Sequence, residues 1–190
     1  MYYHQNLEEH AFAEPYRQGF RKLRILSGYA TSVLLYHILD TYPDAEIELI
    51  IGMSKKDGIK LWDHKRFKQI MNENANISIS YRTALPPVHT KIYHWYMDDL
   101  TPDSVTFVGS ANFSWKGFRD QGELLVEANH SNVEEVFNIT DVISCTDPSI
   151  EQHINFFTVR MQRRNQTLQG VTQEGAQETE SINLQNLKYC

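Results

Sequence analysis

Two short strings near the middle of the chain combine side chains that suit chemistry at phosphorus. The first contains His89 and Lys91, and the second contains Ser110 and Asn112. A neutral imidazole is a competent nucleophile near neutral pH because its ordinary pKa is about 6.5. A Lys ammonium, an Asn amide and a Ser hydroxyl are suitable donors to the negative charge that develops on the non-bridging oxygens of an attacked phosphodiester. These residue types therefore predict a site for nucleophilic attack on a phosphodiester.

The spacing within each string suits a β-strand. Alternate side chains of a strand point the same way, so we expect His89 and Lys91 to share one face. Ser110 and Asn112 are expected to share a face at the end of the next strand. Antiparallel pairing of the two strands would then bring the four side chains together. A His-x-Lys pair alone is typical of a surface strand, and the second string is what favours a functional site.

A carboxylate follows the two strings along the chain. Glu123 is expected at the start of the following strand, where it can hydrogen-bond the second ring nitrogen of a histidine and fix its tautomer. The alternative for Glu123 is a surface charge at a strand end, and Ser110 and Asn112 are also common in turns. We predict that one catalytic site is formed by His89, Lys91, Asn112, Ser110 and Glu123.

Hydrophobic patterning along the chain predicts alternating strands and helices. Ser32 is the expected N-cap of a helix that Pro43 ends, and the nearly continuous apolar run 46–52 is typical of a strand covered on both faces. We infer an α/β fold in which helices pack on a mixed β-sheet. The expected strands are 24–30, 46–52, 77–82, 88–96, 104–108 and 123–127, and the expected helices are 32–42, 65–74, 133–144 and 149–164.

Length and composition fit one domain followed by a polar segment. The chain has 190 residues, of which 41% are hydrophobic, which is enough for a buried core. From Asn165 onward the residues Gln, Glu, Thr and Asn dominate. We therefore predict a domain over 1–164 and a polar tail or linker over 165–190.

Several classes of protein are disfavoured by the sequence. No apolar stretch approaches the roughly 20 residues of a membrane span, and the N-terminus lacks the basic-then-apolar layout of a signal peptide. The two cysteines, Cys145 and Cys190, lie far apart and form no paired motif, so neither a structural disulfide nor a zinc site is expected. We expect a cytoplasmic protein, because a reducing cytosol is the default compartment for such a chain.

The net charge of −6 argues against a nucleic-acid binder, because phosphate contacts need Lys and Arg. The basic residues are nevertheless clustered. These clusters either form solvated helix faces and loops or contact phosphates. They are Arg17, Arg21, Lys22 and Arg24; Lys55, Lys56 and Lys60; and Lys65, Arg66 and Lys68.

The two strings resemble a known family motif. His89-x-Lys91 followed by Gly109-Ser110-x-Asn112 resembles the HxK…GSxN motif of the phospholipase D superfamily. Two spaced strings must occur in order on consecutive strands, which makes the motif pair specific. The resemblance implies a phospholipase-D-like αβα sandwich with a mixed β-sheet and a single HxK…GSxN motif.

A narrower resemblance concerns restriction enzymes. The strings 27–31 and 109–114 are similar to those of NgoFVII-like restriction endonucleases, whose N-terminal domain has a phospholipase D fold. Glu123 fits the acidic position often found downstream of the superfamily motif. The superfamily resemblance covers about residues 24–145.

One position departs from the fuller superfamily motif. That motif places an Asp beyond the Lys after four intervening residues, and this chain has Tyr96 there. Asp98 and Asp99 are near, but a shift of two residues is not equivalent on a strand. The departure argues against activity like that of the two-motif lipid enzymes, whereas nuclease members tolerate it more readily. It is the one feature that favours a catalytically silent module that binds phosphate or DNA.

The resemblance implies a homodimer with a shared active site. The superfamily reaction uses two histidines, one as nucleophile and one as general acid, whereas this chain has a single motif. Two copies of His89 are therefore expected to meet on a two-fold axis. One attacks phosphorus, the protonated partner donates to the leaving oxygen, and water then releases the phosphohistidine.

The implied activity is that of a metal-independent endodeoxyribonuclease, the cleavage domain of a type II restriction enzyme acting on DNA without a cofactor. Lys91 and Asn112 from two subunits would supply the positive charge and the donors. No pattern resembles a helix-turn-helix or zinc finger, so a separate DNA-recognition domain is expected. A nuclease for RNA or single-stranded nucleic acid remains an alternative that the motif does not distinguish, and a lipid hydrolase ranks last.

Overall fold

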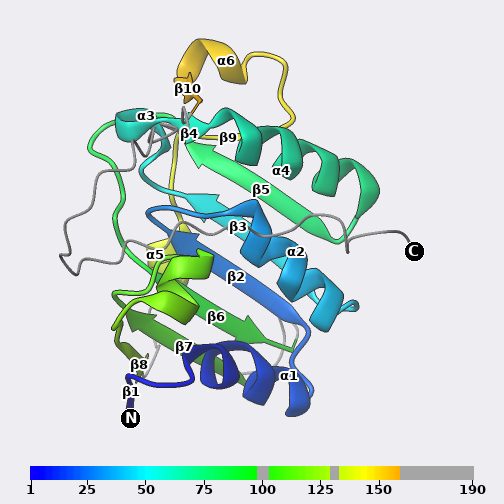
Figure 1. Ribbon diagram of the computed structural model, residues 1–190, viewed down its shortest axis with the longest axis vertical. Coiled ribbons are helices and arrows are strands. Elements are labelled where there is room, and N and C mark those ends of the chain that lie inside the picture. The colour runs from blue at the N-terminus through cyan, green and yellow to red at the C-terminus, as the bar shows by residue number, and fades with distance from the viewer. Residues whose placement is uncertain (98–102, 129–132, 159–190) are drawn as a thin grey trace, which may run out of the picture. The chain divides into compact units, whose positions relative to one another are not determined.

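An eight-stranded mixed sheet forms the centre of the computed structural model, which describes residues 1–97, 103–128 and 133–158. β2, β3 and β5 run parallel, while β6, β7, β8 and β1 extend the sheet on one side with antiparallel pairs. β9 adds an antiparallel strand at the other edge. This architecture confirms the predicted α/β fold (Figure 1). The order across the sheet is β1 (Tyr2–Tyr3), β8 (Leu125–Ala128), β7 (Ser104–Gly109), β6 (Ile92–Tyr96), β2 (Lys22–Ser27), β3 (Glu46–Ile51), β5 (Ile77–Arg82) and β9 (Val142–Ser144).

Helices and two further short strands connect and cover these strands. Among them, β4 and β10 pair in parallel as a separate two-stranded sheet. Two short segments, η1 and η2, are π-helical. The elements are η1 (Glu9–Ala13), α1 (Glu14–Arg17), α2 (Ser32–Thr41), α3 (Ser54–Asp57), β4 (Ile59–Lys60), α4 (Leu61–Glu73), η2 (Lys116–Asp120), α5 (Val133–Phe137), α6 (Ile150–His153) and β10 (Phe156–Phe157).

Both faces of the central sheet are covered, and alternate residues of β2 show how. Leu23 and Ile25 point into the larger core, which also contains buried side chains of α2 and α4. Leu26 points to the opposite face and packs in a second cluster with Phe137 of α5. Each such fully buried aliphatic side chain contributes about 1.5–3 kcal/mol to the stability of the fold. The same double cover explains the buried apolar run 49–51 at the end of β3, in keeping with the strand predicted to be covered on both faces.

Most of the predicted elements are present, with shifted ends. The strand expected over 77–82 is β5, and the helices expected over 32–42 and 65–74 are α2 and α4. The N-cap of α2 is Thr31 rather than Ser32. The buried carboxylate of Asp63 accepts hydrogen bonds from both the amide and the hydroxyl of Ser32, at 2.9 and 2.7 Å. This contact holds the first turn of α2 against α4.

The helix predicted over 133–144 is wrong beyond Phe137. α5 ends there, Asp141 takes a left-handed backbone with φ of 55°, and the chain continues as β9 beside β5. Val142 packs against the smaller cluster and Ile143 against the larger core. A strand whose neighbouring side chains face two covered surfaces has no polar face, so its pattern resembled that of a helix.

The last predicted helix, 149–164, is also shorter than expected. α6 ends at His153, and Phe156 and Phe157 then pair with β4. The aromatic ring of Phe156 packs on His64, with ring centroids 4.2 Å apart, which favours the strand over a continued helix. Residues 159–164 and the predicted tail 165–190 lie outside the described residues.

The structure bears on the predictions about membrane spans and cysteines. Within the described ranges no helix combines the length and the apolar run that crossing a membrane would require. Cys145 is buried and has a free thiol, and burial raises its pKa to about 12. Cys190 lies outside the described residues.

Candidate active site

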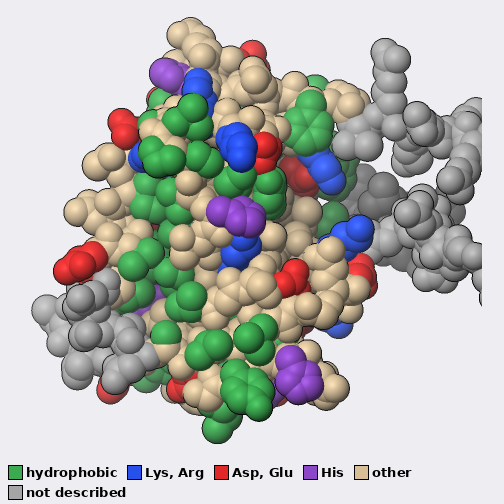
Figure 2. Space-filling model, turned by 90° about the vertical axis from the view of Figure 1, so that its left-hand side faces the viewer, with side chains coloured by type: hydrophobic (Ala, Val, Ile, Leu, Met, Phe, Trp, Pro, Cys, Tyr) green, Lys and Arg blue, Asp and Glu red, His purple; other side chains and the backbone are tan. Residues whose placement is uncertain are grey.

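The two strings predicted to carry chemistry meet where β2 and β7 end and β6 begins. β6 begins at Ile92, which pairs with Leu26 near the end of β2 and with Val108 near the end of β7. The antiparallel pairing of β6 and β7 is therefore as predicted. As a result, the segment before β6 and the segments after β2 and β7 all lie at the same end of these strands. β2 and β5 end on the left in Figure 1, and Figure 2 shows the molecule from that side.

His89 lies in the segment before β6 rather than within a strand, which corrects the predicted strand 88–96. Its side chain is exposed, and its ring lies nearly perpendicular to the Tyr29 ring, with centroids 5.7 Å apart. A Cβ placed on Gly28 would lie 2.6 Å from the imidazole Cδ2. The missing side chain of Gly28 therefore makes the room that the imidazole occupies.

Asn112 approaches the same point from the segment after β7. Its Oδ1 accepts a hydrogen bond from the main-chain amide of Tyr29 at 3.1 Å. The same Oδ1 and the Nε2 of His89 both lie 3.3 Å from a Cβ built on Gly28. Because the amide oxygen of Asn112 is engaged, its Nδ2 is left as a donor. The structure thus brings His89 and Asn112 together around Gly28.

Lys91 differs from His89 in its surroundings. Its side chain is buried, and its ammonium donates to the main-chain oxygen of His89 at 2.7 Å. Burial lowers the pKa of Lys91, while the nearby carboxylate of Glu123 opposes that shift. Lys91 therefore stabilises the segment that carries His89 and places a positive charge beside the imidazole.

Ser110 and Glu123 lie on the side of the site toward β8. The Ser110 hydroxyl accepts from the amide of Leu124 at 3.0 Å, and the Ser110 amide donates to the Leu124 carbonyl at 2.9 Å. Glu123 precedes β8 instead of starting it, and its charge acts on Lys91 and on buried Tyr93. The carboxylate whose charge acts on His89 is that of Asp57.

The packing of the chain before β8 explains the glycine at position 109. A Cβ on Gly109 would lie 1.9 Å from the carbonyl oxygen of Leu124. The glycine therefore permits the close approach of the chain before β8.

The pKa of His89 is lowered from its ordinary value of 6.5. Partial burial is the main cause, and the positive charges of Lys91 and Lys56 act in the same direction, whereas Asp57 opposes them. A lowered pKa keeps the imidazole neutral, and so nucleophilic, at lower pH than for an ordinary histidine.

Three residues of the site carried no predicted role: Ser27, Tyr29 and Asp57. The buried hydroxyl of Ser27 donates to the Tyr29 carbonyl at 2.6 Å and accepts from the Phe113 amide at 2.9 Å, which joins the segments after β2 and β7. The sequence could have pointed to Ser27 and Tyr29, because the string 27–31 is one of the two that resemble NgoFVII-like restriction endonucleases. Asp57 lies on α3, a helix that the hydrophobic pattern did not predict.

Two further residues of β6, His94 and Tyr96, pack against neighbouring side chains away from the candidate site. His94 faces away from the larger core, and its Nδ1 hydrogen-bonds the Thr106 hydroxyl at 2.8 Å. Tyr96 stacks on His94 with ring centroids 5.5 Å apart. Asp98 and Asp99 lie outside the described residues.

The three basic clusters have different partners. In the first cluster the arginines are paired with carboxylates: Arg17 with Glu9, Arg21 with Asp44, and Arg24 with Glu48 and Glu134. In the second, Lys55 donates to a main-chain oxygen, and Lys56 is exposed on α3 and acts on His89. On the face in Figure 2, basic side chains are scattered among hydrophobic ones rather than gathered in one patch.

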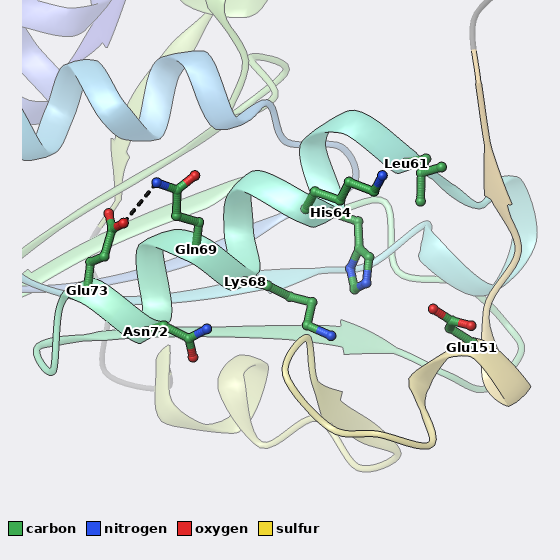
Figure 3. A pocket seen from close by; sticks show the side chains of 8 residues that line it. Leu61, His64, Lys68, Gln69, Asn72, Glu73 and Glu151 are labelled. Carbon is green, nitrogen blue, oxygen red and sulfur yellow. Dashed lines mark hydrogen bonds between the residues drawn. The ribbon is translucent and has the colours of Figure 1, made fainter. Parts of the chain in front are cut away.

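The third basic cluster borders a groove along α4, shown in Figure 3. Lys65 and Lys68 line it together with His64, whose pKa is lowered to about 4, mainly by burial. Gln69 donates to Glu73 at 2.8 Å along the same helix. None of the predicted catalytic residues lines this groove. In the described ranges, no three His, Cys, Asp or Glu side chains gather as metal ligands would.

Comparison with known families gives one match over most of the chain. Residues 5–155 match the model of the NgoFVII restriction endonuclease N-terminal PLD domain. No curated protein matches the chain.

Solved structures of similar fold have low sequence identity. Nuc, a phospholipase D family member from Salmonella typhimurium, is 14% identical over 72% of this chain and 85% of its own, with a TM-score of 0.50. NucT from Helicobacter pylori is 14% identical over 72% of this chain and 87% of its own, with a TM-score of 0.46. A polyphosphate kinase from Porphyromonas gingivalis is 11% identical over 76% of this chain, with a TM-score of 0.49, and this chain spans 23% of its length. At this identity the likeness to Nuc shows the fold alone.

Proposed function

Because the chain belongs to the family of NgoFVII restriction endonuclease N-terminal PLD domains, we propose that it is a metal-independent endodeoxyribonuclease. Its role would be that of the cleavage domain of a type II restriction enzyme. Membership in a family of restriction endonuclease domains supports nuclease function. The observation that carries the proposal is the convergence of His89 and Asn112 around Gly28, with the ammonium of Lys91 behind them.

The proposed reaction is a double displacement at phosphorus. The neutral imidazole of His89 attacks phosphorus, a P–N bond forms, and the bond to the leaving oxygen breaks. A second, protonated imidazole donates its proton to that oxygen. Water then attacks the phosphohistidine, the second imidazole takes the proton of that water, and the P–N bond breaks. The products are a free hydroxyl end and a phosphomonoester end.

Charge on the non-bridging oxygens is stabilised by side chains in this mechanism. The Nδ2 of Asn112 is a suitable donor, because the Tyr29 amide holds Oδ1 and so orients the carboxamide. Lys91 supplies a positive charge that partial burial keeps from being screened by water. Two copies of each residue would face one phosphate, which is why no metal is required.

The second imidazole is expected from a second copy of the chain. A homodimer with both copies of His89 at one two-fold axis completes the acid and base pair. Sequence recognition would then belong to a separate domain, and the substrate is proposed to be double-stranded DNA.

A silent module that binds phosphate or DNA is the second candidate, and one position favours it. Where the superfamily motif has an Asp, the chain has Tyr96, which is partly buried and stacked on His94. An aromatic residue that packs on a structural histidine there supplies no carboxylate to a catalytic site.

Plasmid cleavage in excess EDTA tests the proposal. The full chain is expected to cut, and His89→Ala is expected to lose activity. His153→Ala, which changes a histidine of α6 outside the proposed site, is the matched control and should cut normally. Cutting that requires added magnesium would overturn the metal-independent mechanism. Binding of plasmid without cutting, by the wild type as well as the variant, would favour the silent module, and cutting only of RNA or single strands would favour those substrates.

A further inference from the structure

Tyr29 contacts both strings of the candidate site. Its main-chain amide donates to Oδ1 of Asn112 at 3.1 Å, and its ring meets the His89 ring at 78°, with centroids 5.7 Å apart. It follows Gly28 directly after β2, where the chain passes the imidazole. A single residue of this loop therefore touches two of the side chains that the proposed reaction needs, His89 and Asn112.

The phenol of Tyr29 is held by a carboxylate from another element. Its hydroxyl donates to Oδ2 of Asp57 on α3. Tyr29 as a residue is 40% exposed, so packing alone does not fix its ring. The hydrogen bond to Asp57 raises the pKa of Tyr29, and the phenol remains a donor at neutral pH. Asp57 therefore determines where the ring lies, and the ring lies against His89.

The charged groups that act on His89 come from two segments. Asp57 and Lys56 are neighbours on α3 and act in opposite directions on its protonation, while Lys91 acts from the segment of His89 itself. Tyr29 is neutral, and its ring lies nearly perpendicular to the imidazole. α3 thus presents one negative and one positive charge beside the imidazole.

We propose that Tyr29 and Asp57 are a positioning pair for His89. Asp57 fixes the phenol, the ring of Tyr29 fixes the orientation of the imidazole, and the Tyr29 amide fixes the carboxamide of Asn112. The inference rests on the proposed function in taking His89 as the nucleophile. Neither Tyr29 nor Asp57 exchanges a proton with the substrate in this role.

The pKa of His89, followed by NMR of the full chain labelled at histidine, tests the pair without any need for activity. The His89 signal is assigned by its loss in His89→Gln. Asp57→Asn removes a negative charge and should lower the pKa of His89, whereas Lys56→Gln removes a positive charge and should raise it. Tyr29→Phe frees the Asp57 carboxylate to turn toward water, so the pKa should fall toward the value in Asp57→Asn.

A double variant distinguishes a coupled pair from two separate effects. Adding Tyr29→Phe to Asp57→Asn should move the pKa of His89 no further, because the carboxylate that Tyr29 holds is already gone. Tyr16 donates in the same way to Asp44 at the opposite end of the parallel strands, so Tyr16→Phe and Asp44→Asn are matched controls that should leave His89 unchanged. An unchanged pKa in Tyr29→Phe, or a further shift in the double variant, would overturn the proposal.

Cleavage supplies the second readout. Tyr29→Ala keeps the main-chain amide but removes the ring, and kcat/KM should fall roughly tenfold as the imidazole loses its orientation. Tyr29→Phe should lose less, since the ring remains. Wild-type rates in Tyr29→Ala would overturn the positioning role. If the wild type cuts no nucleic acid, the proposed function falls, and the NMR titrations alone decide on Tyr29 and Asp57.

Discussion

Gly28 is the point where the two halves of the candidate site meet, and a methyl group there is expected to displace His89. The added Cβ would lie 2.6 Å from the imidazole Cδ2, which is closer than two carbon atoms approach without a bond. We expect Gly28→Ala to push the imidazole aside and to lower kcat/KM for DNA cleavage by about ten- to hundredfold. Steady-state plasmid cleavage measures the loss.

A matched glycine separates this effect from a general cost of replacing glycine. A Cβ on Gly122 meets nothing within 4 Å, so Gly122→Ala should cut as the wild type does. Thermal unfolding of both variants shows whether either has lost its fold. Wild-type cleavage by Gly28→Ala would contradict the placement of His89.

The protonation of His89 sets the expected dependence of cleavage on pH. The reaction needs one neutral and one protonated imidazole, and that state is most populated between the two apparent pKa values of the pair. Burial and neighbouring positive charge lower the pKa of His89 from 6.5. The maximum of kcat/KM is therefore expected at a pH below 6.5, and a pH series at constant ionic strength measures it.

The variant Lys56→Gln tests the direction in which the pKa of His89 is shifted. Lys56→Gln removes a charge that lowers the pKa of His89, so the optimum should move to higher pH. An optimum on the alkaline side of 6.5 in the wild type, or one that moves to lower pH in the variant, would be inconsistent with His89 as the titrating group.

At the scale of elements, the segment that carries His89 is anchored to the end of β3. The amide of Val88 donates to the carbonyl of Gly52 at 3.1 Å, and a Cβ on Gly52 would lie 2.0 Å from the Val88 carbonyl oxygen. Gly52→Ala should therefore force the segment outward, cost about 1–3 kcal/mol of stability through overpacking, and lower cleavage. Urea unfolding and plasmid cleavage measure the two effects. Loss of stability with full cleavage would mean that His89 does not depend on this anchor.

The elements that were predicted correctly are those in which the order of apolar and polar residues matches the order of buried and exposed positions. β5 alternates buried and more exposed residues, and residues 49–51 of β3 form a buried apolar run because both faces of the sheet are covered there. β9 was missed since it owes its existence to pairing with β5, which is distant in sequence. α3 has four residues and no apolar face to detect.

The candidate site was predictable to the extent that its residues lie next to the ends of two paired strands. The antiparallel pairing of β6 and β7 was enough to predict that His89 and Asn112 meet, although His89 precedes β6 and Asn112 follows β7. The burial of Lys91 and the bond between Ser110 and Leu124 depend on the packing of β8, which spacing does not reveal. Asp57 follows a different strand from Tyr29, so their contact arises from tertiary structure alone.

At the scale of the whole molecule, the proposed reaction needs one more imidazole than a single motif supplies. The chain has a single His-x-Lys string followed by Gly-Ser-x-Asn, whereas the proposed reaction uses two imidazoles. A second copy supplies the missing group if the two copies of His89 share one site. Subunit mixing then becomes a test of mechanism as well as of assembly.

We expect His89→Ala to inhibit the wild-type protein when subunits exchange. In an equal mixture, random pairing leaves about half of the wild-type chains in mixed dimers. The shared site of a mixed dimer has only one His89 imidazole, so it cannot complete the proposed reaction. The specific activity per wild-type chain should therefore fall to about half, and further as His89→Ala is increased. DNA in large excess prevents simple competition for substrate, and differently tagged subunits confirm by co-purification that mixed dimers form. Undiminished activity in the presence of mixed dimers would mean that each copy cuts with its own His89, and the general acid would then have to be sought within the same chain.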